Sequence, residues 1–266
     1  MYSVDLSGKS ALIFGVANQR SIAWAIARVL HQAGARLALT YQNQRLRDSM
    51  AGLAATLREP QGSALGDVPL LECDVSDDGQ IGATFEEVGR LFGRLSIVVH
   101  SIAYANREDL GGEFSQTGRE GFRVALEVSA FSLLPIARYA APLMEREGGS
   151  IVTLTFQAAE RVFPGYNVMG VAKAALENEV RQLAAELGSR NIRVNAISAG
   201  PLDTLSSRVI RGYHDMKRIY AERAPLQRNV THEEVAKAAL YLCSNLASGV
   251  TGVVLPVDAG YHIMGI

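Results

Sequence analysis

The chain has 266 residues, of which 48% are hydrophobic and 20% are charged, and its formal net charge is −1. This balance predicts a sizeable core, and it supplies no electrostatic footprint for nucleic acid or for an anionic membrane. No apolar run approaches the roughly 20 residues that cross a bilayer, and the N-terminal residues lack the pattern of a signal peptide. Cys73 and Cys243 have neither metal-site nor CxxC spacing. We therefore expect a cytoplasmic protein without a metal and without a nucleic-acid or membrane partner.

Apolar segments alternate with segments of helical periodicity along almost the whole chain. Predicted strands lie at 10–16, 36–41, 69–75, 95–103, 150–156, 192–198 and 252–258. Predicted helices lie at 21–35, 44–59, 85–93 with its flanks, 122–145, 166–188 and 233–244. Because the strands are apolar throughout, we expect a doubly wound, seven-stranded parallel sheet with helices on both faces, in one Rossmann-type domain over residues 1–266. The stretch at about 200–223 shows no clear regular structure, and loops of that length are usually functional.

The first strand–helix junction is where such a fold holds a dinucleotide pyrophosphate, on the N-terminus of the helix. Here the junction starts at Gly15 and reads GVANQRSIAWAIA. The usual GxGxxG pattern is absent, but Ser21 follows as the expected N-cap, with a hydroxyl that could donate to a phosphate. Taken alone, the junction fits a nucleotide site and a plain helix start equally well.

The ends of the next strands should contact the adenosine half of a dinucleotide. The second strand ends at Gln42 without an acid or an arginine, so we expect Gln42 to bond the ribose 2′-hydroxyl and NADH to be preferred over NADPH. After the third strand, Asp74 could accept from the adenine amine while Val75 packs at the ring. Asp74 could equally belong to the N-cap region of the next helix. We expect His100, after the fourth strand, to be structural.

Tyr166 and Lys173 lie seven residues apart on one predicted helix. At 100° per residue they share a face, about 20° apart, with about 10 Å of rise between them. An un-ionised phenol can donate to a developing oxyanion, while the lysine reaches the nicotinamide ribose and adds positive field. We therefore expect both residues to be catalytic.

Ketone reduction in this architecture also uses a hydroxyl near the end of the preceding strand. That strand reads IVTLTFQAAE and places Phe156 ten residues before Tyr166. Thr153 and Thr155 are close by, but they share one strand face that we expect to be buried. A flat ring beside the tyrosine suits an extended, partly apolar substrate, although Phe156 could also be ordinary core.

Seven motifs in order resemble the enoyl-acyl carrier protein reductases, a divergent branch of the short-chain dehydrogenase/reductases. They are GVANQRSIAWAIA, TYQNQRL, CDV, VHSIAYA, AERVFPGYNVMGVAKAALE, RVNAISAGPLDT and VTGVVLPVDAGYHI, and together they cover essentially the whole chain. The Tyr-x6-Lys spacing with its NVMG core distinguishes this branch. The resemblance implies reduction of trans-2-enoyl thioesters on acyl carrier protein, with NADH as the cofactor, as the last step of each fatty-acid elongation cycle. It also implies a homotetramer.

The resemblance assigns roles to individual residues. Tyr166 would hold the enolate oxygen, Lys173 would bind the nicotinamide ribose, and Phe156 would shape the catalytic site in place of a tyrosine that many relatives carry. The family's cofactor contacts fall on Gly15, Ser21, Ile22, Gln42, Asp74, Val75, Ile102, Leu202 and Thr204, and its substrate contact falls on Ala105. Conjugate reduction need not protonate the carbonyl as an alcohol, which explains the absent hydroxyl and the wider Tyr–Lys spacing.

The segment 205–225 fits the family's mobile substrate-binding stretch. An apolar face over an acyl chain would come from Val209, Ile210, Tyr213, Met216 and Ile219, and a basic edge for an acidic carrier protein from Arg211, Lys217 and Arg218. A solvated amphipathic helix is an equal alternative for the basic residues. Asp203 and Asp215 stand where relatives carry basic residues.

Two other functions remain open at this point. A carbonyl reductase of the same superfamily is disfavoured by the missing hydroxyl and the wider spacing, and a cofactor-sensing protein without turnover is disfavoured by the presence of both Tyr166 and Lys173. The apolar helix at 122–145, with Leu126, Val128, Phe131 and Leu134, could form a subunit interface or be buried within one subunit.

Overall fold

The computed structural model describes residues 4–57, 67–205, 207, 210 and 212–265. Seven parallel strands form one sheet in the order β3-β2-β1-β4-β5-β6-β7. The strands are β1 Ser10–Phe14, β2 Arg36–Tyr41, β3 Leu70–Glu72, β4 Ile97–His100, β5 Gly149–Thr155, β6 Ile192–Ala199 and β7 Val254–Val257. The predicted fold class, a doubly wound parallel sheet, is confirmed.

The helices are α1 Ile22–Gln32, α2 Gln44–Ala54, α3 Asp78–Phe92, α4 Arg119–Leu126, α5 Leu133–Met144, α6 Asn167–Leu187, α7 Tyr213–Arg223 and α8 His232–Cys243. A π-helical turn, Glu127–Phe131, joins α4 to α5. The stretch at 200–223 is therefore not irregular throughout, because α7 occupies its second half. The weak amphipathicity of α7 explains why the sequence pattern gave no clear signal: only Tyr213 and Tyr220 are buried.

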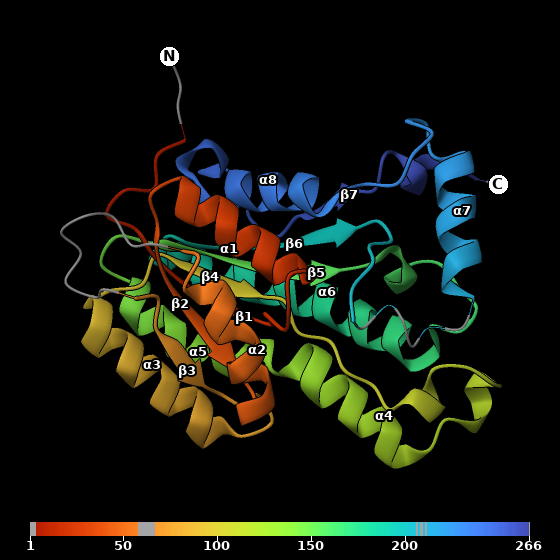
Figure 1. Cartoon of the computed structure of the whole chain (residues 1–266), viewed down its shortest axis with the longest axis horizontal. Coiled ribbons are helices and arrows are strands. Elements are labelled where there is room, and N and C mark those ends of the chain that lie inside the picture. Colours follow the sequence, from red (N-terminus) through yellow and green to blue (C-terminus); the bar gives the residue numbers. More distant parts are fainter. Residues whose placement is uncertain (1–3, 58–66, 206, 208–209, 211, 266) are drawn as a thin grey trace.

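Alternating side chains of each strand face two separate cores. In β1, Ala11 and Ile13 belong to the core under α1, α2 and α8, whereas Leu12 and Phe14 belong to the core under α3, α5 and α6. Figure 1 shows α1 and α8 over one face of the sheet and α3 and α5 on the other. This burial on both faces explains why the strands are apolar throughout.

The strands β1, β3, β4 and β7 are shorter than predicted, and β3 and β4 end early because the chain turns to shape the ligand edge of the sheet. β3 ends at Glu72, since the Asp74 carboxylate then accepts from the backbone N–H of Ser76 and closes a turn. β4 ends at His100, and the residues after it leave the sheet. The strand order reverses between β1 and β4, the point where doubly wound sheets bind ligands.

The helix Arg119–Met144 contradicts the expectation that no apolar segment approaches the length of a membrane span. Its 26 residues match a membrane span by length, and its most apolar 18-residue window matches one by composition. However, 56% of its most apolar window is buried inside the protein. Leu133, Ile136 and Ala140 pack in the core with α3 and α6, as in the central helix of a globular fold.

Candidate active site

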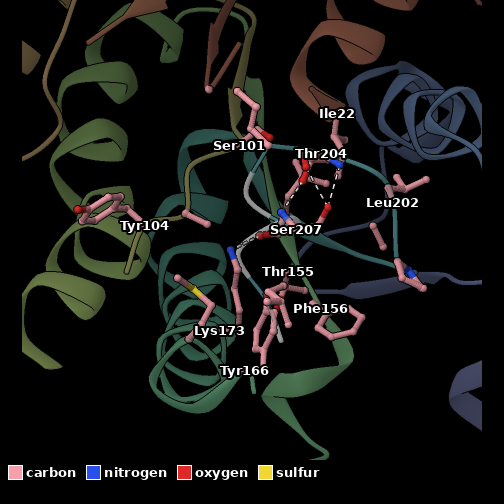
Figure 2. A pocket seen from close by; sticks show the side chains of 18 of the residues that line it. Ile22, Ser101, Tyr104, Thr155, Phe156, Tyr166, Lys173, Leu202, Thr204 and Ser207 are labelled. Atoms are coloured by element: carbon pink, nitrogen blue, oxygen red, sulfur yellow. Dashed lines mark hydrogen bonds between the residues drawn. The ribbon is translucent and has the colours of Figure 1, made fainter. Parts of the chain in front are cut away.

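A cavity of about 520 Å³ opens at the carboxyl ends of β1, β4, β5 and β6. This volume is in the range of small-molecule and cofactor sites. Of the residues expected to bind ligand or cofactor, it is lined by Gly15, Ser21, Ile22, Ile102, Ala105, Phe156, Tyr166, Lys173, Leu202 and Thr204. The structure therefore brings together side chains from five separate parts of the chain, several of which are seen in Figure 2.

Three expected cofactor residues, Gln42, Asp74 and Val75, lie beyond the lining of this cavity, after the ends of β2 and β3. Gln42 Nε2 donates to Asp74 Oδ2 over 3.0 Å. Burial raises the pKa of Asp74, but the hydrogen bonds from Ser76 and Gln42 outweigh it and leave the pKa lowered. The N-cap of α3 is Asp77, and Asp74 lies in the turn just before it, where its carboxylate accepts from Ser76 and its backbone N–H donates to Gln80 Oε1.

Ser21 occupies the N-cap position of α1, but its side chain makes no capping bond. Its Oγ instead accepts from the backbone N–H groups of Ala17 and Asn18, at 2.9 and 3.0 Å, and so shapes the loop after β1. The first-turn amides of α1 therefore have no side-chain cap, and such amides attract an anion. The hydroxyl hydrogen of Ser21 remains available to donate.

Tyr166 immediately precedes α6, and Lys173 lies two turns into it. The Lys173 Nζ donates to the Leu154 carbonyl over 2.8 Å. Burial lowers the pKa of Lys173 to about 8, and the nearby Glu177 carboxylate acts against this shift. Burial, with a smaller contribution from Tyr213, raises the pKa of Tyr166, so its phenol remains a donor at neutral pH.

The hydroxyls of β5 are already engaged. The Thr155 hydroxyl donates to Glu177 Oε1 over 2.7 Å, and the Thr153 hydroxyl donates to the His100 carbonyl over 3.1 Å. His100 is fully buried between Thr153 and Ser132, and burial lowers its pKa to about 3, which keeps it neutral. This environment fits the structural role expected for His100. Both threonines are buried, as expected, so neither presents a free hydroxyl to a carbonyl.

Phe156 lines the cavity and is also part of a small aromatic core. Its ring centroid lies 5.1 Å from that of Tyr166 and 4.8 Å from that of Phe163. Tyr220 stacks on Tyr261 with 3.6 Å between the centroids and donates to Gln157 Oε1 over 3.0 Å. Both interpretations of Phe156, as cavity wall and as core residue, therefore describe its position.

Sequence reasoning did not identify Tyr220 or Glu177. Tyr220 lies seven residues after Tyr213, so helical periodicity could have placed both on one buried face of α7. Glu177 lies one turn after Lys173 on α6, and a carboxylate on a buried helix face is the signal that could have found it.

The loop after β6 is tied to α7. Asp203 and Lys217 form an ion pair of 2.6 Å, the Tyr213 hydroxyl donates to the Leu202 carbonyl, and Thr204 exchanges hydrogen bonds with Ser207. Ile210, Tyr213 and Met216 line the cavity, whereas Ile219 lines a neighbouring one. Val209 and Arg211 lie outside the described residues.

Nearby acids pair with Lys217 and Arg218, the two described residues of the expected basic edge. Lys217 pairs with Asp203, and Arg218 pairs with Glu222 at 2.9 Å and with Asp215 at 3.8 Å. These pairs support the solvated-helix alternative for Lys217 and Arg218.

Comparison with known proteins agrees with this arrangement. A model of the enoyl-(acyl carrier protein) reductase family matches residues 15–262. An enoyl-[acyl-carrier-protein] reductase [NADH] of Nostoc sp. is 52% identical over 98% of this chain and 99% of its own length. A reductase of Staphylococcus aureus named for NADPH is 47% identical over 97% of this chain and 98% of its own length. The crystal structure of the Bacillus cereus enoyl-acyl carrier protein reductase with NADP+ and indole naphthyridinone matches with a TM-score of 0.94 and 50% identity, over 98% of this chain and 99% of that one. The chain belongs to the enoyl-acyl carrier protein reductase family.

Proposed function

We propose that this protein is an NADH-dependent enoyl-acyl carrier protein reductase, which converts trans-2-enoyl thioesters to saturated acyl thioesters at the end of each elongation cycle. One observation carries the proposal. Tyr166 and Lys173 line the same cavity, while the Thr155 hydroxyl beside them is already bonded to Glu177. The site thus offers a phenol donor and a buried cation without the second hydroxyl that a ketone reductase uses.

The cavity fits a nicotinamide dinucleotide. Gly15 lines it at the end of β1, where a φ of +92° and the Ser101 carbonyl oxygen, 1.9 Å from where a Cβ would lie, leave room only for glycine. Ser21, Ile22 and Thr204 would hold the pyrophosphate side, with Leu202 and Ile102 at the nicotinamide side. The Gln42–Asp74 pair and Val75 would hold the adenosine, and the lack of a cation in that pair favours NADH.

The chain's own residues would stabilise charge and exclude water. When bound, NADH would supply a hydride to the β-carbon of the enoyl group, and the α-carbon would then be protonated. Tyr166 would donate to the thioester oxygen as enolate charge develops there. Lys173 would bond the nicotinamide ribose and add positive field beneath Tyr166, while Phe156 and Ala105 would hold the flat, apolar part of the substrate.

The substrate and assembly follow from the same arrangement. The acyl chain would lie against Ile210, Tyr213 and Met216, with the thioester delivered by acyl carrier protein. Phe122 and Phe131 are exposed on the helix Arg119–Met144, with Leu126, Val128 and Leu134 half-buried beside them. An apolar helix face of this kind would join subunits of a homotetramer. Because Cys73 and Cys243 are both free and buried, we place the enzyme in the reducing cytoplasm.

The test is oxidation of NADH and of NADPH by the wild-type protein with a crotonyl thioester, followed at the absorbance band of the reduced cofactor. Tyr166→Phe should bind NADH as the wild type does and lose about 100-fold in kcat, the range of one oxyanion donor. Tyr241→Phe is a matched control, since the Tyr241 ring is exposed and does not line the cavity. The proposal would be overturned if the folded wild-type protein binds NADH but does not oxidise it with any enoyl thioester.

A further inference from the structure

Helix α6 is joined to the end of β5 by two side-chain hydrogen bonds that run in opposite directions. Lys173 of α6 donates to the Leu154 carbonyl of β5, and Thr155 of β5 donates to Glu177 of α6. Lys173 and Glu177 are four residues apart, so they lie on one helix face a turn from each other. Both are buried, with exposed fractions of 4% and 5%. The two bonds set where the Lys173 amine lies relative to the cavity.

Glu177 acts from behind the cavity, because Lys173 and Thr155 line the cavity and Glu177 does not. A buried carboxylate costs free energy unless donors or positive charge compensate. A glutamine could accept the Thr155 hydrogen bond equally well and at a lower desolvation cost. The contact between β5 and α6 therefore does not require an ionisable group, and the charge of the Glu177 carboxylate needs a separate explanation.

The charged groups around Glu177 come from two elements. Lys173 and Arg181 of α6 favour the ionised carboxylate, whereas Glu160, in the loop after β5, opposes it. The pKa of Glu177 is raised above its ordinary value, chiefly by burial, and the Thr155 hydrogen bond only partly offsets this. At the end of β4, burial lowers the pKa of His100 and keeps it neutral, and the Lys173 charge lowers that pKa further. Glu177 is thus the anionic group that acts on the Lys173 amine.

We propose that Glu177 is a positioning residue for this reaction: it anchors Thr155 to α6 and keeps the Lys173 amine charged and directed into the cavity. The charged amine has three hydrogens, of which one is used by Leu154, so two remain for ligand. The same contact turns the Thr155 hydroxyl away from the cavity. The inference rests on the proposed function for its kinetic readout, but the charge state of Lys173 can also be followed by cofactor binding.

The experiment measures kcat/KM for crotonyl thioester, and the Kd for NADH by cofactor fluorescence, across the pH range of about 6 to 10. Removing the carboxylate charge lowers the pKa of the Lys173 amine further, since a neighbouring anion favours the protonated form. In Glu177→Gln, the alkaline limb of both profiles should therefore move down by about one pH unit, while values well below pH 7 change little. Glu177→Met, which keeps most of the packing, should show the same shift.

Two controls separate charge from structure. Glu177→Asp keeps the charge and should leave the alkaline limb within a few tenths of a unit of the wild type. Glu186→Gln removes an acid from the exposed face of the same helix and should leave the profile unchanged. Urea unfolding identifies any variant that does not fold. If one of the two neutral variants at Glu177 does not fold, the other is sufficient for the test.

The role of Glu177 would be overturned if every neutral variant that folds has its alkaline limb at the wild-type pH. An equal shift of the alkaline limb in Glu186→Gln would also overturn it. If the wild-type protein does not reduce the thioester, the proposed function fails by itself. The pH profile of NADH binding then still decides whether Glu177 controls the charge of Lys173.

Discussion

Gly15 and Ser101 approach so closely that a Cβ on Gly15 would lie 1.9 Å from the Ser101 carbonyl oxygen. The contact joins the end of β1 to the residue after β4, where the strand order reverses. It explains why a chain without the GxGxxG pattern retains a glycine here. The requirement comes from the packing of two neighbouring strands and from a φ of +92°, so it holds whether or not a nucleotide is present.

Gly15→Ala should therefore destabilise the fold by several kcal/mol, because it combines a backbone clash with a strained φ. Urea unfolding measures the loss, and NADH binding should weaken with it. Gly52→Ala is the matched control: Gly52 lies within α2, and a Cβ added there would meet no atom within 4 Å, so alanine should stabilise the helix by about 0.5–1 kcal/mol. Equal stability of the two variants would contradict this explanation of Gly15.

Lys173 should make stability depend on pH in the alkaline range. Its pKa is lowered from 10.5 to about 8 in the folded chain, chiefly by burial. Below pH 8 the amine is protonated in both states, and the folded state bears the full burial cost. Between pH 8 and 10.5 the unfolded chain binds more protons, so the free energy of unfolding rises with pH.

The measurement compares wild type with Lys173→Met by urea unfolding, so that titrations common to both proteins cancel. From about pH 8 to about pH 9.5 the wild type should gain about 2 kcal/mol relative to the variant. A constant difference across that range would show that the amine is not buried in the folded protein.

The ion pair between Asp203 and Lys217 links the cavity loop to α7. Both side chains are partly exposed, at 59% and 23%, so their coupling in a double-mutant cycle should be below about 1 kcal/mol. Because the pair holds the segment that would cover the acyl chain, Asp203→Asn and Lys217→Met should each raise KM for a long-chain thioester about threefold with little change in kcat. A changed kcat at constant KM would place the pair in the chemical step instead.

Tyr220 supports the aromatic wall behind Phe156. Tyr220→Phe keeps the stack on Tyr261 but leaves Gln157 Oε1 without its donor, which should cost about 1 kcal/mol. Tyr220→Ala should cost about 3–5 kcal/mol, because it opens a cavity in the buried cluster. Urea unfolding distinguishes the two effects, and equal losses would show that the hydroxyl, and not the ring, carries the stabilisation.

The sequence by itself determined the features that depend on local order. Apolar strands alternating with helices predicted the doubly wound sheet, since strands buried on both faces must be apolar throughout. The sequence also predicted that Tyr166 and Lys173 meet at one site, and both line the cavity, although Tyr166 precedes α6 and is separated from it by Asn167 with a φ of +36°, so the two do not share a helix face.

Only the tertiary structure decided which polar groups meet. Thr155 bonds to Glu177 because α6 packs on β5, and Gln42 bonds to Asp74 because β2 lies beside β3. Ser21 accepts from its own loop because of the path that the loop takes after β1. Sequence periodicity gives the face on which a side chain lies but not the partner across from it. For that reason the site's phenol and amine were predictable, whereas the bond between Thr155 and the carboxylate behind them was not.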